Sequence, residues 1–235
     1  MGYEGCQPRL PYGDMPKNVL PWPAEWTIPA RADWPAMIKE RQGKMLASLT
    51  RGKIGVHDQG STSRCWVHGS VRAVELLRIY EGQSPLMLSP DSVAYPIEGT
   101  RDRGGYPEHA CEQLAIGGAC PQSAWPESEL APTNADKDWE EKALNHVLLR
   151  WIEIKTWDQQ IYCGLNSIPV SIGLGWWGHL VCQVEPVVLG KSDVGIDFDN
   201  SWGNDWGYNG SGILDEESGT ADLGAFAPIS ETFSS

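Results

Sequence analysis

Hydrophobic and polar residues alternate with a helical period in the first part of the chain and with a strand period in the last part. The clearest helical pattern covers residues 66–80, where apolar side chains recur every three or four positions and Gly82 follows as a stop signal. These apolar positions are Val67, Val71, Val74 and Leu77. Weaker patterns of the same period predict helices at residues 35–49, 107–116 and 136–149.

Beyond Arg150 the pattern is typical of β-strands. The stretches that alternate, or that are rich in β-branched residues, are WIEIKTW, PVSIGL, HLVCQVEPVVL and GIDFDNSWG. A helical half followed by a β half predicts an α+β fold. The functional cleft is expected where the two halves meet.

The amino-terminal segment has a different character. Residues 1–35 contain seven of the 17 prolines, with Trp22, Trp26 and Trp34 between them. This composition favours extended, polyproline-like chain. Two interpretations of the segment remain open: an arm packed on its own domain, or an aromatic-studded strap that docks on a protein partner.

Charge and composition narrow the range of functions. The net charge of −13 argues against nucleic-acid binding, which requires a basic face. The sequence has no apolar run of about eighteen residues, so no membrane span is expected, and its amino end lacks the pattern of a secretory signal. Six cysteines without paired spacing predict reduced thiols, and hence a cytoplasmic protein or one inside a cytosolically assembled particle.

The stretch DQGSTSRCWVHGS, residues 58–70, carries the strongest chemical signal. Cys65 stands where the clearest predicted helix begins, and the positive end of a helix lowers the pKa of a thiol. A nucleophilic thiolate also needs an imidazole, and His179 lies at the head of a predicted strand in the β half. Asn200 can accept a hydrogen bond from that ring and orient it, while Trp202 can shield the bond from water.

In combination these positions resemble the papain-like cysteine peptidases. In QGSTSRCW, as in that family, glutamine precedes the nucleophilic cysteine by six positions, and NSWG at residues 200–203 is identical to the family's asparagine motif. The order of glutamine, cysteine, histidine and asparagine is also the same. Further stretches that resemble the family are IPARADW, LSPDS, RGGYP, PVSI and DWGYNGSG, so the resemblance spans about residues 28–228, with gaps.

The resemblance implies a catalytic role for four side chains. Cys65 would be the nucleophile, His179 its partner acid and base, and Asn200 the group that orients the histidine. Gln59 would donate its side-chain N–H to the oxyanion of the tetrahedral intermediate, and the backbone N–H of Cys65 would be the second donor. No cofactor is implied, and no metal-ligand spacing links the remaining histidines to cysteines or carboxylates.

The resemblance also implies a binding groove for a protein or peptide substrate. Gly104 and Gly105 would pair with the substrate main chain, as an added strand does. Tyr106 and Pro107 would wall an apolar side-chain pocket, and Trp202 would complete the substrate-binding set.

Several positions depart from the family pattern. Thr62 and Ser63 stand where the family has a cysteine shortly before the nucleophile, and Asp102 stands where that cysteine would have its disulfide partner. The joint loss of both halves of a bridge agrees with a reducing compartment. Arg64 replaces a small residue beside Cys65, where a cation either helps to hold thiolate or crowds the groove.

Two further departures concern access to the site. The connection from Ser171 to His179 is shorter than in the family, which predicts a more open cleft with Trp176 and Trp177 in place of the lost wall. The residues before Ile28 are too few for the family's inhibitory pro-segment. Control is therefore expected from assembly, from substrate access, or from the proline-rich arm lying over the cleft.

The sequence thus predicts a papain-like two-lobe fold with the active-site cleft between the lobes. Its three parts are an arm (1–27), a strap plus helical lobe with the nucleophile (28–130) and a β-barrel-type lobe with His179 and Asn200 (131–235). The predicted function is a cysteine peptidase that acts through a thioester acyl-enzyme. Two alternatives remain: a structural subunit of a larger assembly, such as a phage or virus particle, with weak or no activity, and a cell-wall peptide amidase.

Overall fold

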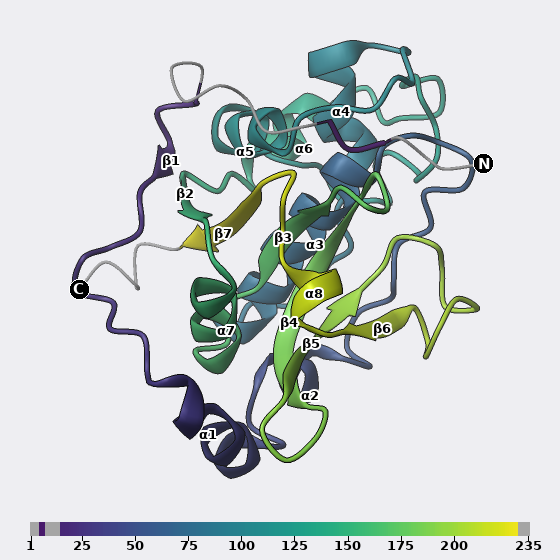
Figure 1. Ribbon diagram of the computed structural model, residues 1–235. Coiled ribbons are helices and arrows are strands. Elements are labelled where there is room, and N and C mark those ends of the chain that lie inside the picture. Colours follow the sequence, from purple (N-terminus) through teal and green to yellow (C-terminus); the bar gives the residue numbers. More distant parts are fainter. Residues whose placement is uncertain (1–4, 8–14, 230–235) are drawn as a thin grey trace.

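A mixed sheet of seven strands runs through the middle of the molecule, with helices on both of its faces (Figure 1). The structure is a computed structural model that describes residues 5–7 and 15–229, so Pro8 and Pro11 of the predicted arm lie outside the described residues. The strand order is β1-β2-β7-β3-β4-β5-β6. β1 and β2 are parallel, and the other neighbouring strands are antiparallel.

The strands are β1 (Val19–Leu20), β2 (Arg150–Ile154), β3 (Val170–Leu174), β4 (His179–Val188), β5 (Val194–Asp199), β6 (Ser211–Leu214) and β7 (Ala225–Ile229). The helices are α1 (Trp34–Arg41), α2 (Leu46–Thr50), α3 (Cys65–Tyr80), α4 (Pro90–Glu98), α5 (Pro107–Ile116), α6 (Trp139–Leu144), α7 (Trp157–Leu165) and α8 (Glu216–Gly219), with a short 3-10 helix η2 (Arg31–Asp33) before α1. This confirms the predicted α+β class.

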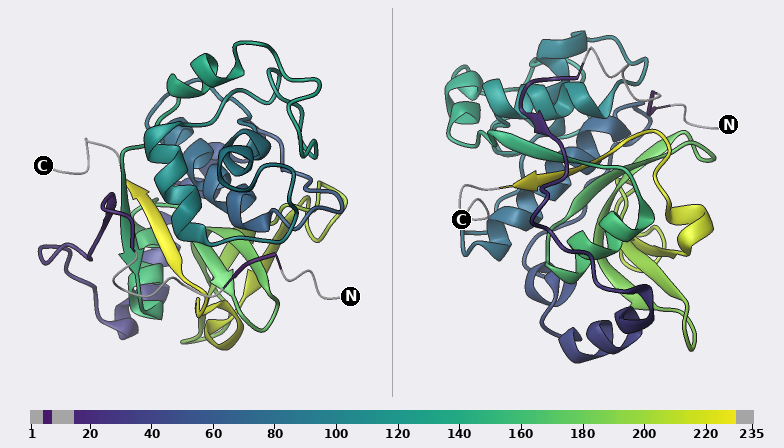
Figure 2. Two further views of the ribbon diagram at one scale, coloured as in Figure 1. Left: turned by 90° about the horizontal axis from the view of Figure 1, so that it is seen from above. Right: turned by 60° about the vertical axis from the view of Figure 1, so that its left-hand side comes forward.

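The alternation of side chains along the strands divides the interior into two main cores. Trp151 and Phe226 pack in one core with residues of α3, α4 and α5. These helices cover one face of the sheet (Figure 2, left). Ile152 and Ala225, the neighbours of Trp151 and Phe226 in the chain, point to the opposite face, where they pack in one core with residues of α1 and α7. Successive strand residues face opposite sides of a sheet, so a sheet with both faces covered reads as nearly continuous apolar sequence.

Helix α3 lies unusually close to strand β4. A Cβ atom on Gly69 would collide with the side chain of Leu180 and would lie 3.1 Å from the carbonyl carbon of Val181. Glycine is therefore required at this position for the helix to approach the strand. The contact brings the first turn of α3 against the first residues of β4, and these two points carry Cys65 and His179.

Two predicted helices are confirmed and two differ. The helices at Cys65–Tyr80 and Pro107–Ile116 agree with the sequence pattern. Residues 35–49 form two helices instead of one, because the chain turns at Gly43 with a φ of 77° in the left-handed region. The predicted helix at 136–149 is confined to Trp139–Leu144.

The sequence pattern missed three helices, α4, α7 and the short α8. WIEIKTW does not continue as a strand, because Thr156 and Gln159 form a capping box that starts α7 at Trp157. In LSPDS, the Ser89 side chain accepts from Ser92 N–H and Pro90 occupies the first turn, and together they start α4.

Helix α6 packs on the helical half of the molecule. Trp139 and Ala143 of α6 pack in one cluster with Trp125 and Tyr95 of the helical half. Helix α6 therefore lies against α4.

The described part of the amino-terminal arm packs on the chain itself. β1 pairs with β2, and the chain then runs along the sheet edge to α1 (Figure 2, right). Trp22 and Trp26 contact the Tyr162 ring of α7 at centroid distances of 5.1 and 5.5 Å. These contacts agree with the interpretation of an arm packed on its own domain. Among the described helices, none is both long enough and apolar enough to span a membrane.

A buried chain of ion pairs joins α3 to β5 and to two neighbouring loops. His57 Nδ1 is 2.7 Å from Glu127 and its Nε2 is 3.0 Å from Glu75, while Arg72 binds both Glu75 and Asp199. Burial lowers the pKa of His57, but the two carboxylates outweigh it and raise that pKa to about 9.

The His57 imidazolium should make folding stability depend on pH. Because its folded pKa lies above the unfolded value, its contribution is complete below about pH 6.5 and is lost as the pH rises to about 9, by about 3 kcal/mol at most. The free energy of unfolding, measured with urea at pH 6.5, 7.5 and 9, should show this decline. His57→Gln should make the free energy of unfolding less dependent on pH and should lower it at pH 6.5. His109→Gln on α5 is the matched control, and an unchanged slope in His57→Gln would contradict the assignment.

Candidate active site

Cys65 begins helix α3, with its sulfur beside the start of strand β4. As a first-turn residue it has a backbone N–H without a partner inside the helix. The side chain is fully buried, and burial raises the pKa of the thiol to about 12, although the backbone amides of Leu180 and Trp66 act in the opposite direction. The thiol is therefore protonated in this conformation.

His179 and Asn200 form the hydrogen bond that the sequence predicts. The Nε2–H of His179 donates to Oδ1 of Asn200 at 2.7 Å. The same oxygen accepts from the backbone N–H of Ser201 at 2.8 Å, which fixes the orientation of the amide. Burial lowers the pKa of His179 to about 4, and Asn200 opposes that effect. The imidazole is neutral, and among the described residues its Nδ1 has no hydrogen-bond partner.

Two tryptophans enclose the imidazole. The ring centroid of Trp202 lies 4.8 Å from that of His179, and the ring centroid of Trp177 lies 4.9 Å from that of His179. The two indoles also contact each other edge to face. Trp202 thus lies where it shields the hydrogen bond between His179 and Asn200 from water, as the sequence analysis expects.

Gln59 is held from both sides by short hydrogen bonds. Its Oε1 accepts from the hydroxyl of Ser201 at 2.6 Å, and its Nε2 donates to the carbonyl of Thr62 at 2.6 Å. Its backbone N–H donates to the carbonyl of Ser201, and Asp58 forms a bridge with Trp202. The loop before the nucleophile is therefore joined directly to the NSWG segment.

Neither Ser201 nor Thr62 is among the predicted site residues. Ser201 stands within the quoted NSWG motif, so its place beside Asn200 was a visible signal. The contact of Thr62 with Gln59 follows from the loop conformation, and the sequence offers no signal for it.

Polar contacts stand where the family pattern has a disulfide. The backbone N–H of Ser63 donates to Asp102 at 2.6 Å, so these two positions are still joined. Arg64 neither crowds the groove nor faces the thiol. Its side chain is fully buried and binds Asp91 at 2.5 Å and Glu98 at 3.0 Å, so the cation stabilises the helical half.

The amino-terminal segment Gly5–Gln7 occupies the groove beside the glycine pair. Gly105 N–H donates to Gly5 carbonyl at 3.0 Å, and Gln7 N–H donates to Gly105 carbonyl at 2.9 Å. This is a parallel bridge between Cys6 and Gly105. On the other side, Gly178 carbonyl accepts from the N–H groups of Gly5 and Cys6 at 3.1 and 3.2 Å. Gly105 thus pairs with an extended segment of the chain's own arm, and its pairing with a substrate stays a prediction.

The arm covers the sulfur of Cys65. A Cβ atom on Gly5 would lie only 2.6 Å from that sulfur and 3.0 Å from the carbonyl oxygen of Ser63. The amino-terminal segment therefore contributes to the complete burial of the thiol.

The other predicted binding residues near Gly105 are its neighbours in the chain, Gly104, Tyr106 and Pro107. Gly104 has a φ of 72°, which favours glycine, and it precedes the bridge at Gly105. Tyr106 is half-buried and packs against the ring of His109, and Pro107 is buried as the first residue of α5. Trp176, in the short turn between β3 and β4, is 61% exposed.

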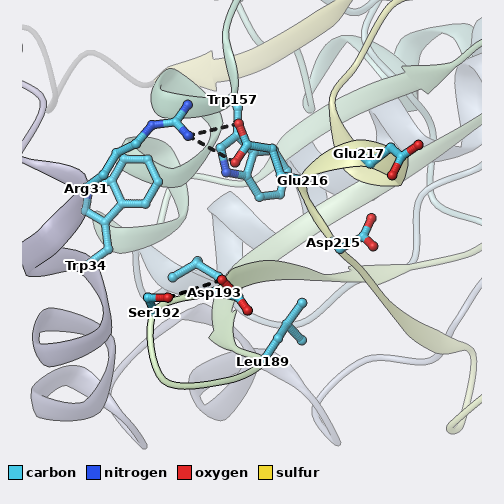
Figure 3. Close-up of a pocket in the computed structure, with 10 residues that line it drawn as sticks. Arg31, Trp34, Trp157, Leu189, Ser192, Asp193, Asp215, Glu216 and Glu217 are labelled. Atoms are coloured by element: carbon cyan, nitrogen blue, oxygen red, sulfur yellow. Dashed lines mark hydrogen bonds and ion pairs between the residues drawn. The ribbon is translucent and has the colours of Figure 1, made fainter.

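A separate cavity of about 500 Å³ lies between α1, α8 and the turn joining β4 to β5 (Figure 3). Its lining includes Arg31, Trp34, Trp157, Asp193 and Glu216, and it contains none of the predicted catalytic residues. Among the residues that the structure describes, no three His, Cys, Asp or Glu side chains are grouped so as to hold a metal ion.

Solved structures with a similar fold are cysteine proteases and their precursors. Xylellain, a cysteine protease from Xylella fastidiosa, is 20% identical with a TM-score of 0.60, over 75% of this chain and 83% of its own. Procathepsin L 3 of the Tenebrio molitor larval midgut is 16% identical with a TM-score of 0.68, over 92% of this chain and 75% of its own. A structure from a comparison of the mite allergens Blo t 1 and Der p 1 is 16% identical with a TM-score of 0.63, over 94% and 78%.

These similarities show the fold of the chain. It is the papain-like two-lobe α+β fold that the motifs predict. No protein-family model matches the sequence, and no curated protein matches it. The fold is thus recognised through its three-dimensional arrangement and a small number of motifs.

Disturbing the arm should expose the thiol. In Gly5→Val the new side chain meets the Cys65 sulfur and the Ser63 backbone, so the segment should leave the groove. Alkylation of Cys65 by iodoacetamide at pH 8 should then be faster by about tenfold or more, because each unit by which the thiol pKa falls gives about ten times more thiolate. Gln7→Ala keeps the backbone pairing with Gly105 and should label at the wild-type rate. Equal rates for all three proteins would show that the segment does not cover the sulfur in solution.

Proposed function

We propose that the protein is a cysteine peptidase that hydrolyses peptide bonds through a thioester acyl-enzyme. The observation that carries this proposal is the oriented imidazole. His179 is bonded through Nε2 to Asn200, its Nδ1 is the free base, and the sulfur of Cys65 lies against the next residue of the same strand, Leu180. A nucleophile, a base and a group that orients the base are the requirements of this chemistry.

The reaction follows from these positions. Nδ1 of His179 takes the thiol proton, and the sulfur of Cys65 attacks the carbonyl carbon of the substrate. The resulting oxyanion accepts from the backbone N–H of Cys65 and from the Nε2 of Gln59. The imidazolium then protonates the leaving amine, and His179 next activates the water that cleaves the thioester.

Gln59 is suited to its role because its orientation is fixed before the substrate binds. Ser201 donates to Oε1, which directs the opposite end of the amide, Nε2, toward Thr62 and the beginning of α3. A donor that is already oriented needs no reorganisation when the negative charge develops.

The arm is proposed to hold the enzyme in a resting state. A substrate with its acyl part along Gly105 would run from Gly105 toward Cys65. The arm runs the other way, with Gly5 at the sulfur and Gln7 beyond the bridge to Gly105. The segment also excludes water from the thiol and imidazole, and desolvation disfavours their ion pair. Activity then requires that Gly5–Gln7 leave the groove.

One observation favours the alternative of a structural subunit with little activity. Both Cys65 and His179 are buried and neutral, as they would be in a fold retained for its shape. The two readings differ in whether Cys65 reacts selectively once a suitable ligand competes with the arm.

An epoxysuccinyl thiol inhibitor at mildly acidic pH should label Cys65 selectively. The adduct is mapped by mass spectrometry, and His179→Ala should abolish the labelling because the thiol then lacks its base. Slow and equal labelling of all six cysteines would favour the structural subunit instead. Casein and purified peptidoglycan are then supplied in parallel. Release of peptides from casein indicates a peptidase, and release of stem peptides from peptidoglycan indicates a cell-wall amidase.

Gln59→Ala should lower kcat/KM for a peptide substrate by about a hundredfold to a thousandfold, the usual effect of losing one oxyanion donor. Selective labelling of Cys65 should persist in this variant, because the thiol and His179 are untouched. Gln83→Ala, an exposed glutamine after α3, is the matched control and should retain wild-type activity. Thermal unfolding of each variant shows whether a loss of activity reflects a loss of folding.

A further inference from the structure

Cys6 lies in the arm beside the candidate nucleophile and takes no part in the proposed reaction. It is 5% exposed and packs in one buried cluster with Cys65, Leu180 and Leu223. Both thiols are free.

The other four cysteines lie in four separate clusters: Cys111, Cys120, Cys163 and Cys182. Among the described residues, Cys6 and Cys65 are therefore the one pair of cysteines that the fold brings into a common cluster.

The backbone of the arm lies directly against the Cys65 sulfur. The Cβ position of Gly5 is 2.6 Å from the Cys65 sulfur, and Cys6 is the next residue, about 3.8 Å further along the chain. A disulfide joins Cα atoms about 4.4–6.8 Å apart, so the bond requires the arm to bring Cys6, in place of Gly5, up to the Cys65 sulfur. The Cys6 sulfur lies 3.1 Å from the Cβ position of Gly173, so the backbone of the arm has to shift before the two sulfurs can meet.

We propose that Cys6 and Cys65 form a reversible disulfide that locks the arm over the cleft. The bond is inferred from the shared cluster and from the position of Gly5, and its effect on activity rests on the proposed peptidase function. The arm then has two modes of closure. Four backbone hydrogen bonds close it reversibly in the reduced protein, and the disulfide closes it in the oxidised protein.

The oxidant required is a peroxide, and the step balances as follows. While the arm is lifted, the Cys65 thiolate attacks one peroxide oxygen, the O–O bond breaks, and a sulfenic acid and one water result. When the arm returns, the Cys6 thiolate attacks the sulfenic sulfur, the S–O bond breaks, and the second water leaves. Two thiols lose two electrons and two protons, and one peroxide becomes two waters. A dithiol reductant reverses the step by exchange.

The lock would also protect the nucleophile. A sulfenic acid that meets no second thiol is oxidised further to sulfinic acid, which ordinary thiols do not reduce. Because Cys6 returns to the sulfenic sulfur each time the arm closes, oxidation stops at the disulfide.

The test uses the full-length protein. It is treated with hydrogen peroxide, free thiols are blocked with N-ethylmaleimide, and a tryptic digest without reductant is analysed by mass spectrometry. Trypsin releases MGYEGCQPR and CWVHGSVR, so the expected product is these two peptides joined, about 2 Da lighter than their sum. Dithiothreitol should separate them. Cys6→Ser should abolish the linkage, and Cys111→Ser, which removes a buried cysteine of another cluster, should retain it.

Activity gives the second readout. Oxidised wild type should lose its casein hydrolysis and regain it with dithiothreitol, whereas Cys6→Ser should be inactivated irreversibly. The lock would be overturned if sulfinic acid formed at Cys65 equally fast in wild type and in Cys6→Ser. It would also be overturned if a non-reducing gel showed the linkage only between two chains. Linkage without casein hydrolysis supports the lock and contradicts the peptidase proposal, and hydrolysis without linkage contradicts the lock alone.

Discussion

The candidate site depends on one packing contact, that between α3 and β4. Cys65 is the first residue of the helix and His179 the first residue of the strand, so the approach of these two elements sets both positions at once. Gly69 makes the approach possible, because any side chain there would meet Leu180 and the backbone of Val181. Asn200 and Gln59 are then added from loops that are themselves joined, through the contacts of Gln59 with Ser201.

Charge and hydrogen bonds fix these loops where a covalent bridge is missing. Asp199, the residue before Asn200, binds Arg72 of α3 and Arg51 after α2, so the backbone that carries the asparagine is tied to the helix that carries the nucleophile. Ser63 is joined to Asp102, and Arg64 is paired with two carboxylates. Buried pairs of this kind are costly to break one partner at a time, so they specify a single arrangement. A chain with reduced thiols gains from such pairs the rigidity that a disulfide would supply.

The sequence predicted the parts of the fold that depend on local pattern. The spacing of Val67, Val71, Val74 and Leu77 placed α3, and the combination of Gln59, Cys65, His179 and Asn200 placed the motifs on the correct elements. Helix α7 was missed because Trp157–Leu165 follows a strand-like alternation, and its start depends on the capping contacts of Thr156. The ion pairs of Arg64 could not be predicted from the residues next to it in the sequence, because its carboxylate partners, Asp91 and Glu98, lie on a different helix. The position of Cys6 rests on backbone pairing with Gly105 and Gly178, for which no sequence pattern exists.

The arm is anchored at two places of unequal strength. Near β1 it pairs with β2 and packs Trp22 and Trp26 against Tyr162, whereas the segment over the thiol is held by four main-chain hydrogen bonds and a small cluster of side chains. In the proposed resting state, the segment over the thiol opens as a local fluctuation while the contacts near β1 stay in place. A blocking strand of this kind remains at an effective concentration of the order of millimolar, as short tethers do. The balance between blocked and open molecules would consequently be the same in a dilute sample as in a crowded one, since opening involves no partner that can diffuse away.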